Sequence, residues 1–288
     1  MTNTTARMAS AIIKLTIIFC ATTSFAAAPT SDWPPLWRHV AESYIIATGT
    51  LHAPIEEIKF AVASGKRKCV NLQLTLTESF KGEAPPELNI SWNTGTGGFL
   101  DSNSVVEMDG KEVLVFLDTV DESRKELHFA NYIPEALSLA DDPRTDAVRR
   151  ECQKQAQQLA KFDTNFQPAK VALYKEVKAL INSTTKKRKQ MQAFEKLEQL
   201  GADAVPAIVM LMDDRRDLPV QGISLRNKSA NAFEAYRHYC PDKVVDALAA
   251  ILNQITGDSF ADIVSGGSER ERQKAVNGWR IYLYHLQG

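Results

Sequence analysis

The sequence has few of the residue types that form metal sites and nucleophilic centres. Five histidines are spread over 288 residues, and none occurs in the paired H-E-x-x-H spacing. There is no G-x-S-x-G elbow, and the glycines at 95–98 and 266–267 lack the spacing and the Lys-Ser/Thr ending of a phosphate loop. The formal net charge of -1 gives no overall attraction to nucleic acid. These absences predict no catalytic residue, no cofactor, no metal and no nucleic-acid partner.

A long hydrophobic run occurs once, at the N-terminus. Arg7 and Lys14 precede the apolar stretch LTIIFCATTSFAAAP, which ends in small residues. A basic segment, a short apolar core and a small-x-small site ending at Ala26 are typical of a secretory signal peptide. The apolar core is too short to remain as a membrane-spanning helix. We therefore predict a signal peptide at 1–26, a periplasmic or secreted product, and no stable membrane anchor after removal of the leader.

Cysteine is also scarce. Cys20 lies in the predicted leader, so that Cys69, Cys152 and Cys240 remain, and their spacing does not fit a metal site. An odd number allows at most one intramolecular disulfide. Two arrangements stay open: a disulfide between Cys69 and Cys152, or three buried thiols. Neither arrangement provides a reactive cysteine.

The segment 32–142 is predicted to be a small β-barrel domain. In CVNLQLTLT, hydrophobic residues alternate with polar ones from Val70 to Leu76, which is the period of a half-buried strand. Similar patterns occur in SYIIATGTL, LNISW, VVEMDGKEVLVFLD and KELHFANYI, giving about five strands. Asp109-Gly110, between apolar runs, predicts a hairpin with a type I′ turn. Several short antiparallel strands with one amphipathic face favour a barrel.

Part of this segment resembles a known family. The pattern LQLTLTESFKGEAPPELNISW followed by MDGKEVLVFLD resembles netrin/TIMP-like domains, which are OB-type barrels, over about residues 40–140. The resemblance implies the barrel fold. Inhibitors of that family use a cysteine at the mature N-terminus and several disulfides, and this sequence has neither. Protease inhibition is therefore not implied.

After Asp142 the hydrophobic period becomes helical. Connecting helices are predicted within 143–183, at about 143–162 and 169–183, and a HEAT-like helical domain within 184–288. In that domain, helices are expected at about 186–200, ended by Gly201 at the C′ position, and around 227–239. Two further helices are expected to begin at Asp203 and Pro241.

Two stretches of this half are similar to each other. FEKLEQLGADAVPAIVMLMDD and FEAYRHYCPDKVVDALAAILNQ both suggest a helix, a short turn and a helix, with Phe194 and Phe233 in equivalent places. A spacing of roughly forty residues suits stacked helix pairs. The sequence here resembles HEAT-like repeats over about 170–288, which implies a short α-helical stack.

The last predicted helix closes this stack. Ser268 and Glu271 have the spacing of a capping box, and the negative charge at this helix start disfavours a bound phosphate. An apolar stripe that includes Trp279 is expected to cover the end of the stack, whereas Arg270 and Arg272 are expected to face water. The stripe consists of Ala275, Val276, Trp279, Tyr282, Leu283 and Leu286.

One charge run is unusual. Lys186, Lys187, Arg188 and Lys189 stand at a predicted helix start, where positive charge opposes the helix dipole. The run is either a solvated face or a contact for an acidic partner. With no catalytic set, the sequence predicts an exported protein-interaction protein of the envelope, adaptor or inhibitor-like, whose partner is another protein. The alternative is a secreted hydrolase with its active site in the groove between the two domains.

Overall fold

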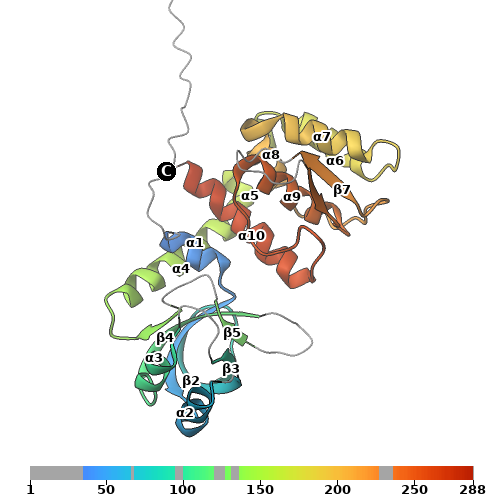
Figure 1. The fold of residues 1–288 in the computed structure, drawn as a ribbon. Coiled ribbons are helices and arrows are strands. Elements are labelled where there is room, and N and C mark those ends of the chain that lie inside the picture. The colour runs from blue at the N-terminus through green and yellow to red at the C-terminus, as the bar shows by residue number, and fades with distance from the viewer. Residues whose placement is uncertain are drawn as a thin grey trace, which may run out of the picture. The chain divides into compact units, whose positions relative to one another are not determined.

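A computed structural model describes residues 35–65, 68–94, 100–119, 127–130, 136–226 and 236–287. Within Pro34–Gly288, which forms one unit, the fold is α+β, with a barrel in the N-terminal half and mostly helices in the C-terminal half (Figure 1). The predicted signal peptide at 1–26 lies outside the described residues.

Five strands close the barrel. They are connected in the order β1-β2-β3-β5-β4, and β1 pairs with β4 to complete the ring. The pair β3–β5 is parallel and the others are antiparallel, while β6 adds to the edge of β4. This confirms the predicted small β-barrel. The strands are β1 Ile45–His52, β2 Cys69–Lys81, β3 Glu87–Asn93, β4 Glu112–Thr119, β5 Leu127–Phe129 and β6 Leu137–Leu139.

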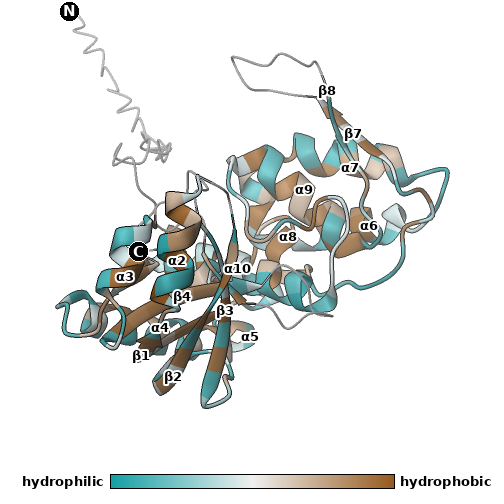
Figure 2. Ribbon diagram, turned by 60° about the horizontal axis from the view of Figure 1, so that its bottom comes forward, coloured by the Kyte–Doolittle hydropathy of each residue, from teal (hydrophilic) through white to brown (hydrophobic). Residues whose placement is uncertain are grey.

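The alternation that predicted β2 also fills the barrel. Leu74 pairs with Leu88, and the next inward-facing residues along the two strands also pair with each other. These side chains are buried, whereas the polar residues between them on β2 are exposed. Figure 2 shows hydrophobic residues concentrated on the barrel strands. A side-chain period of two therefore sets both the register and the core.

The predicted hairpin at Asp109-Gly110 is wrong. The residues before it form a short helix, α3 (Ser102–Glu107), so that the turn connects a helix to β4. Gly110 has a φ of 70°, but Asp109 does not have the positive φ that a type I′ turn requires. The turn instead holds the end of β1. The Asp109 carboxylate accepts a hydrogen bond from the backbone N–H of Ala53 at 2.8 Å, and the Gly110 N–H donates to the Leu51 carbonyl at 2.8 Å.

The C-terminal half contains all but one of the expected helices, most of them shorter than predicted. Gly201, with a φ of 65°, follows α7 in the predicted C′ position. Two helices, α1 Leu36–Glu42 and α2 Ile55–Ala63, lie earlier in the chain. The later helices are α4 Arg144–Ala160, α5 Phe162–Asn165, α6 Tyr174–Thr184, α7 Gln190–Gln199, α8 Val205–Met210, α9 Val244–Thr256 and α10 Glu269–Leu286, with 3-10 turns at Pro168–Lys170 and Gly201–Ala204.

The helix predicted around 227–239 is wrong over its described part. Tyr236–Tyr239 is strand β8, which pairs antiparallel with β7 (Ile223–Arg226). Residues 227–235, with Phe233, lie outside the described ranges. A strand forms because Tyr239 is buried opposite buried Ile223, whereas Tyr236 at the other end stays exposed. The HEAT-like stack is therefore not confirmed.

Three helices join the two hydrophobic clusters of the structure. On α1, Val40 belongs to the barrel cluster and Ala41 to the helical cluster. On α4, in the predicted connecting segment, Cys152 packs in the barrel cluster and Leu159 against the helical one. Helix α10 packs on both α1 and α4 (Figure 1). Helices α1 and α10 also contribute to the charged cleft described below.

Candidate functional site

The four basic residues at 186–189 form an exposed turn between α6 and α7. Backbone hydrogen bonds close the turn: the Lys189 N–H donates to the Lys186 carbonyl at 2.7 Å, and the Lys186 N–H donates to the Ser183 carbonyl at 3.0 Å. Within the part of the chain that the structure describes, none of the four side chains has an acidic partner. We call residues 186–189 the basic turn.

A buried glutamine anchors the basic turn. Gln190, the first residue of α7, is fully buried, and its amide pairs with the backbone of Val220 in the loop after α8. The Gln190 amide nitrogen donates to the Val220 carbonyl at 2.5 Å, and its amide oxygen accepts from the Val220 N–H at 3.1 Å. The sequence analysis did not identify this residue, because its partner lies 30 residues away.

A charged cleft of about 720 Å³ lies between the barrel and the C-terminal helices. Its walls come from α1, the ends of β1 and β4, the loop at 259–264 and the first turns of α10. Within α1, Arg38 contacts Glu42 at 2.8 Å, and Arg38 also contacts Asp258. Across the cleft, Lys274 of α10 contacts Asp118 of β4 at 2.6 Å. Several of the charged groups that line the cleft are therefore already ion-paired.

Burial shifts the acid–base behaviour of two side chains near this cleft. Burial raises the pKa of Glu42, although the adjoining Arg38 guanidinium opposes the shift. Burial lowers the pKa of His39, and the charge of Arg38 lowers it further. His39 is on α1 but does not line the cleft. The described residues that line the cleft beside Glu42 include no histidine.

The predicted end of the helical half is partly confirmed. The Ser268 hydroxyl accepts from the Glu271 N–H at 3.2 Å, and the Glu271 carboxylate accepts from the Ser268 N–H at 2.7 Å, as a capping box requires. Trp279 is fully buried. Leu286 is 44% exposed, so the apolar stripe ends before it.

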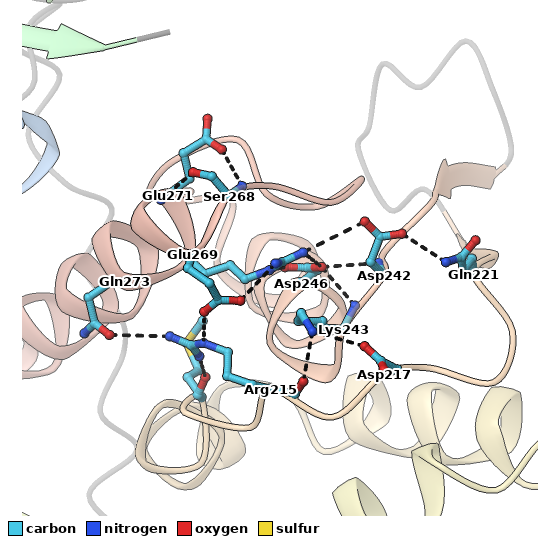
Figure 3. Close-up of polar contacts among 12 residues, drawn as sticks. Arg215, Asp217, Gln221, Asp242, Lys243, Asp246, Ser268, Glu269, Glu271 and Gln273 are labelled. Atoms are coloured by element: carbon cyan, nitrogen blue, oxygen red, sulfur yellow. Dashed lines mark hydrogen bonds and ion pairs between the residues drawn. The ribbon is translucent and has the colours of Figure 1, made fainter. Parts of the chain in front are cut away.

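The expectation that Arg272 faces water is wrong. The Arg272 side chain is 6% exposed and makes two hydrogen bonds to the buried Asp246 carboxylate, at 2.8 and 2.9 Å. Asp246 also accepts from the backbone N–H groups of Lys243 and Asp242, which directly precede α9 (Figure 3). The pair thus joins the start of α10 to the start of α9. The sequence could have indicated that Arg272 is buried. It stands three and four residues before Ala275 and Val276, and residues at this spacing share one face of a helix.

Arg270 is only partly exposed. Its guanidinium lies over the ring of Tyr44, 4.0 Å from the centroid. Tyr44 directly precedes β1, so this cation–π contact joins α10 to the barrel. No local pattern predicts it, because the two residues are far apart in the sequence.

Lys81 is the last residue of β2, and its side-chain amine is buried against α1. Its Nζ donates to the carbonyl of Val40 and to that of Ala41, the latter at 3.1 Å. Burial lowers the pKa of Lys81 to about 8, and burial raises the pKa of the nearby Cys152 thiol to about 11. At neutral pH the thiol therefore keeps its proton.

These two shifts predict a dependence of stability on pH. The unfolded chain keeps the Lys81 proton up to its ordinary pKa of 10.5, whereas the folded chain releases it near 8. The unfolded state then binds more protons, so the free energy of unfolding should rise as the pH increases from 8 towards 10.5. The Cys152 thiol has the opposite effect. In the unfolded chain it releases its proton near pH 9, and in the folded chain near pH 11, so its contribution to the free energy of unfolding falls across that interval.

Urea unfolding measured at a series of pH values checks this prediction. The unaltered protein should become more stable between pH 7.5 and 9. The rise should be absent in Lys81→Met, and the later fall should be absent in Cys152→Ala. A rise of the same size in Lys81→Met would show that another group causes it.

The remaining predicted features have these outcomes. None of Cys69, Cys152 and Cys240 is in a disulfide, and only Cys152 is buried, so neither arrangement left open by the sequence is observed. Over the described ranges, no group of three or more His, Cys, Asp or Glu residues is arranged to hold a metal ion. Within the same ranges, no helix combines the length and hydrophobicity needed to cross a membrane.

Comparison with known proteins gives no assignment: no family model, no curated protein and no solved structure matches the chain.

Proposed function

We propose that the chain is an exported, non-catalytic interaction protein of the cell envelope, adaptor or inhibitor-like, that binds an acidic surface of another protein. The basic and apolar N-terminal segment supports export. The basic turn supports the acidic partner, and it is the observation on which this proposal depends.

The basic turn has two properties of a binding surface. Its four cations are exposed, with no acidic partner in the described chain, so a partner can reach them without breaking an internal ion pair. Its backbone is fixed by the Gln190 amide, so binding orders mainly the side chains rather than a loop. Grouped charges of one sign increase the association rate with an oppositely charged surface and favour one partner over others.

The barrel supports a second part of the proposal. We propose that it is of the OB type, a five-stranded barrel that binds ligands through strand faces and loops in many proteins. The closed order β1-β2-β3-β5-β4 supports this, as does the resemblance to netrin/TIMP-like domains. The barrel lacks the paired cysteines of those inhibitors, because Cys69 is a free thiol.

The charged cleft gives the hydrolase alternative one supporting observation, a carboxyl group, Glu42, whose pKa is raised by burial. A hydrolytic site would also need a base next to a nucleophile. The described lining contains the hydroxyls of Tyr44, Thr119 and Ser259 but no histidine, and Glu42 is bonded to Arg38. The lining is also not the smooth aromatic and aliphatic surface expected of an adaptor groove. The cleft therefore does not support a docking groove, and the basic turn supports binding better than the cleft supports hydrolysis.

Neutralising the basic turn should weaken partner binding. In a variant with Lys186, Lys187, Arg188 and Lys189 all changed to Gln, the affinity for the main partner should fall by about 10- to 100-fold, as expected for the loss of several exposed charge pairs. The partner is first identified by mass spectrometry after affinity purification from the envelope fraction. Binding is then measured at 50 and 300 mM salt, and the unaltered protein should lose affinity at the higher salt.

A matched variant removes the same number of charges elsewhere, at exposed lysines on other elements: Lys59, Lys154, Lys161 and Lys175, each changed to Gln. It should bind as the unaltered protein does. Equal loss in both variants would indicate a general charge effect. Unchanged binding in the basic-turn variant would show that these residues are only a solvated surface.

A further inference from the structure

A second cavity, of about 380 Å³, lies between β2, α1, α4 and α10, and we call it the α4–α10 cavity. One part of its wall is apolar and is formed by Phe80, Ala156, Leu159 and Ile281. Lys81 lines another part. The volume lies within the usual range of small-molecule sites. The cavity can therefore hold a small organic molecule beside the Lys81 amine.

The backbone of α1 holds the Lys81 amine in place. The Lys81 Nζ donates to the Val40 carbonyl and, at 3.1 Å, to the Ala41 carbonyl. A charged ammonium group has three N–H groups, whereas a neutral amine has two N–H groups and a lone pair. The neutral amine can therefore keep both hydrogen bonds to α1 while its lone pair is left for a reaction.

Groups from four elements act on the Lys81 amine. Burial does most to lower its pKa to about 8, and the charge of Lys274 on α10 contributes. Cys152 of α4 and the carboxylates of Asp118 on β4 and Glu42 on α1 act in the opposite direction, without restoring the ordinary value. The Cys152 thiol also lines the cavity but keeps its proton at neutral pH, because burial raises its pKa to about 11. Of these two nucleophiles, the amine is therefore the one that neutral pH makes available.

We propose that the α4–α10 cavity binds a small aldehyde with an aliphatic or single-ring body, and that the Lys81 amine joins this aldehyde as an imine. The nitrogen lone pair attacks the carbonyl carbon, and a proton moves from the nitrogen to the oxygen to give a carbinolamine. Loss of one water molecule then forms the C=N bond. The step needs no oxidant or reductant, and hydrolysis reverses it. The apolar wall covers the body of the aldehyde.

The lowered pKa sets the expected preference for Lys81 over other lysines. At pH 7, an amine with a pKa of about 8 is neutral about 300 times more often than an ordinary lysine with a pKa of 10.5. A less basic amine is also a weaker nucleophile, so the gain in rate is smaller than this ratio. We expect the imine to form at Lys81 at least about ten-fold faster than at Lys154, an exposed lysine on α4.

Reductive trapping of the unaltered protein with hexanal tests this proposal. Sodium cyanoborohydride reduces an imine to a secondary amine, and peptide mass spectrometry then measures the alkylation of each lysine. At pH 7, Lys81 should be alkylated at least about ten-fold faster than Lys154, and this ratio should fall towards pH 10, where ordinary lysines also become neutral. In guanidinium chloride the preference should disappear, because unfolding exposes the amine to water. Equal rates in the folded protein, or the same preference in guanidinium chloride, would overturn the proposal.

Two pairs of variants locate the reaction. Lys81→Arg keeps a positive charge and N–H donors for α1 but has no amine, so the fast alkylation in intact mass spectra should be lost except at the α-amino group, while Lys154→Arg should retain it. Ala156→Trp should occupy the cavity and slow the alkylation of Lys81 to the rate at Lys154, while Ala160→Trp, one turn later and outside the lining, should not.

Urea unfolding confirms that each variant is folded. Fast alkylation of Lys81 that persists in a folded Ala156→Trp protein would show that the aldehyde does not occupy the cavity, and it would overturn the proposal. If Ala156→Trp does not fold, the ratio of rates at Lys81 and Lys154 in the unaltered protein decides the question, and a ratio near one would overturn the proposal.

Discussion

Replacing Asp246 with alanine should lower the free energy of unfolding by about 3–5 kcal/mol, because the change leaves the buried charge of Arg272 without its partner. Asp246 is fully buried and accepts two hydrogen bonds from the Arg272 guanidinium, at 2.8 and 2.9 Å. The same carboxylate accepts the N–H groups of Asp242 and Lys243, so the start of α9 would lose acceptors as well (Figure 3). Urea unfolding measures the loss.

A double-mutant cycle separates the charge from the rest of this effect. Arg272→Met alone leaves the Asp246 carboxylate uncompensated. The double variant Asp246→Ala with Arg272→Met leaves no charge of this pair unpaired and should be less destabilised than the sum of the single changes by at least about 1 kcal/mol. Asp246→Asn, which keeps one oxygen for the helix start, measures the capping part.

An exposed pair in the same network provides the matched control. Asp217 contacts Lys243 at 3.1 Å, but its side chain is 86% exposed. Asp217→Ala should therefore change stability by less than about 1 kcal/mol. If Asp246→Ala were as mild as Asp217→Ala, or if the two changes in the cycle were additive, the buried pair would not have the role described here.

Local sequence patterns were sufficient for the barrel strands and for the start of α10. The alternation in β2 depends only on which side of the strand faces the core, and the Ser268–Glu271 box involves residues three apart. The hairpin was predicted because Asp109-Gly110 lies between two apolar runs. Tertiary context instead placed the first run in α3, where Val105 is buried.

The sequence did not indicate which residues line the charged cleft or enclose the Lys81 amine, because these residues come from distant segments. Lys81 meets α1 about 40 residues away, and Lys274 meets Asp118 across 156 residues. A single sequence gives no sign of which distant residues meet. The basic turn, in contrast, is one run of four residues, so its position could be predicted, although the buried glutamine that anchors it could not.

The region of strand β8, where a helix was predicted, shows another limit of prediction from sequence. The stretch around Tyr236–Tyr239 has the aromatic and polar mixture of an amphipathic helix, and the adjacent α9 has a strong helical stripe, so a helix pair was predicted. The strand forms because β7 supplies a partner for its backbone hydrogen bonds. Pairing with another segment determines the strand, and a helical period over a short stretch does not exclude it.

Replacing Trp279 with alanine should also lower the free energy of unfolding by about 3–5 kcal/mol, through the loss of a buried aromatic side chain and the cavity left behind. The Trp279 ring is fully buried and packs edge-on against Phe260 and Tyr282, with centroids 5.0 and 5.3 Å apart. Phe260 lies in the loop before α10, and Tyr282 lies on α10 itself. The cavity would therefore open between α10 and that loop.

Two further variants make the Trp279 prediction specific. Trp279→Phe should cost less than Trp279→Ala, because phenylalanine refills part of the space and the indole N–H has no hydrogen-bond partner to lose. Leu286→Ala, at a position 44% exposed on the same helix, should cost less than about 1 kcal/mol. In thermal and urea unfolding, Trp279→Ala should lose the most stability, Trp279→Phe less, and Leu286→Ala the least. A Trp279→Ala protein as stable as Leu286→Ala would show that α10 does not depend on this ring for its packing.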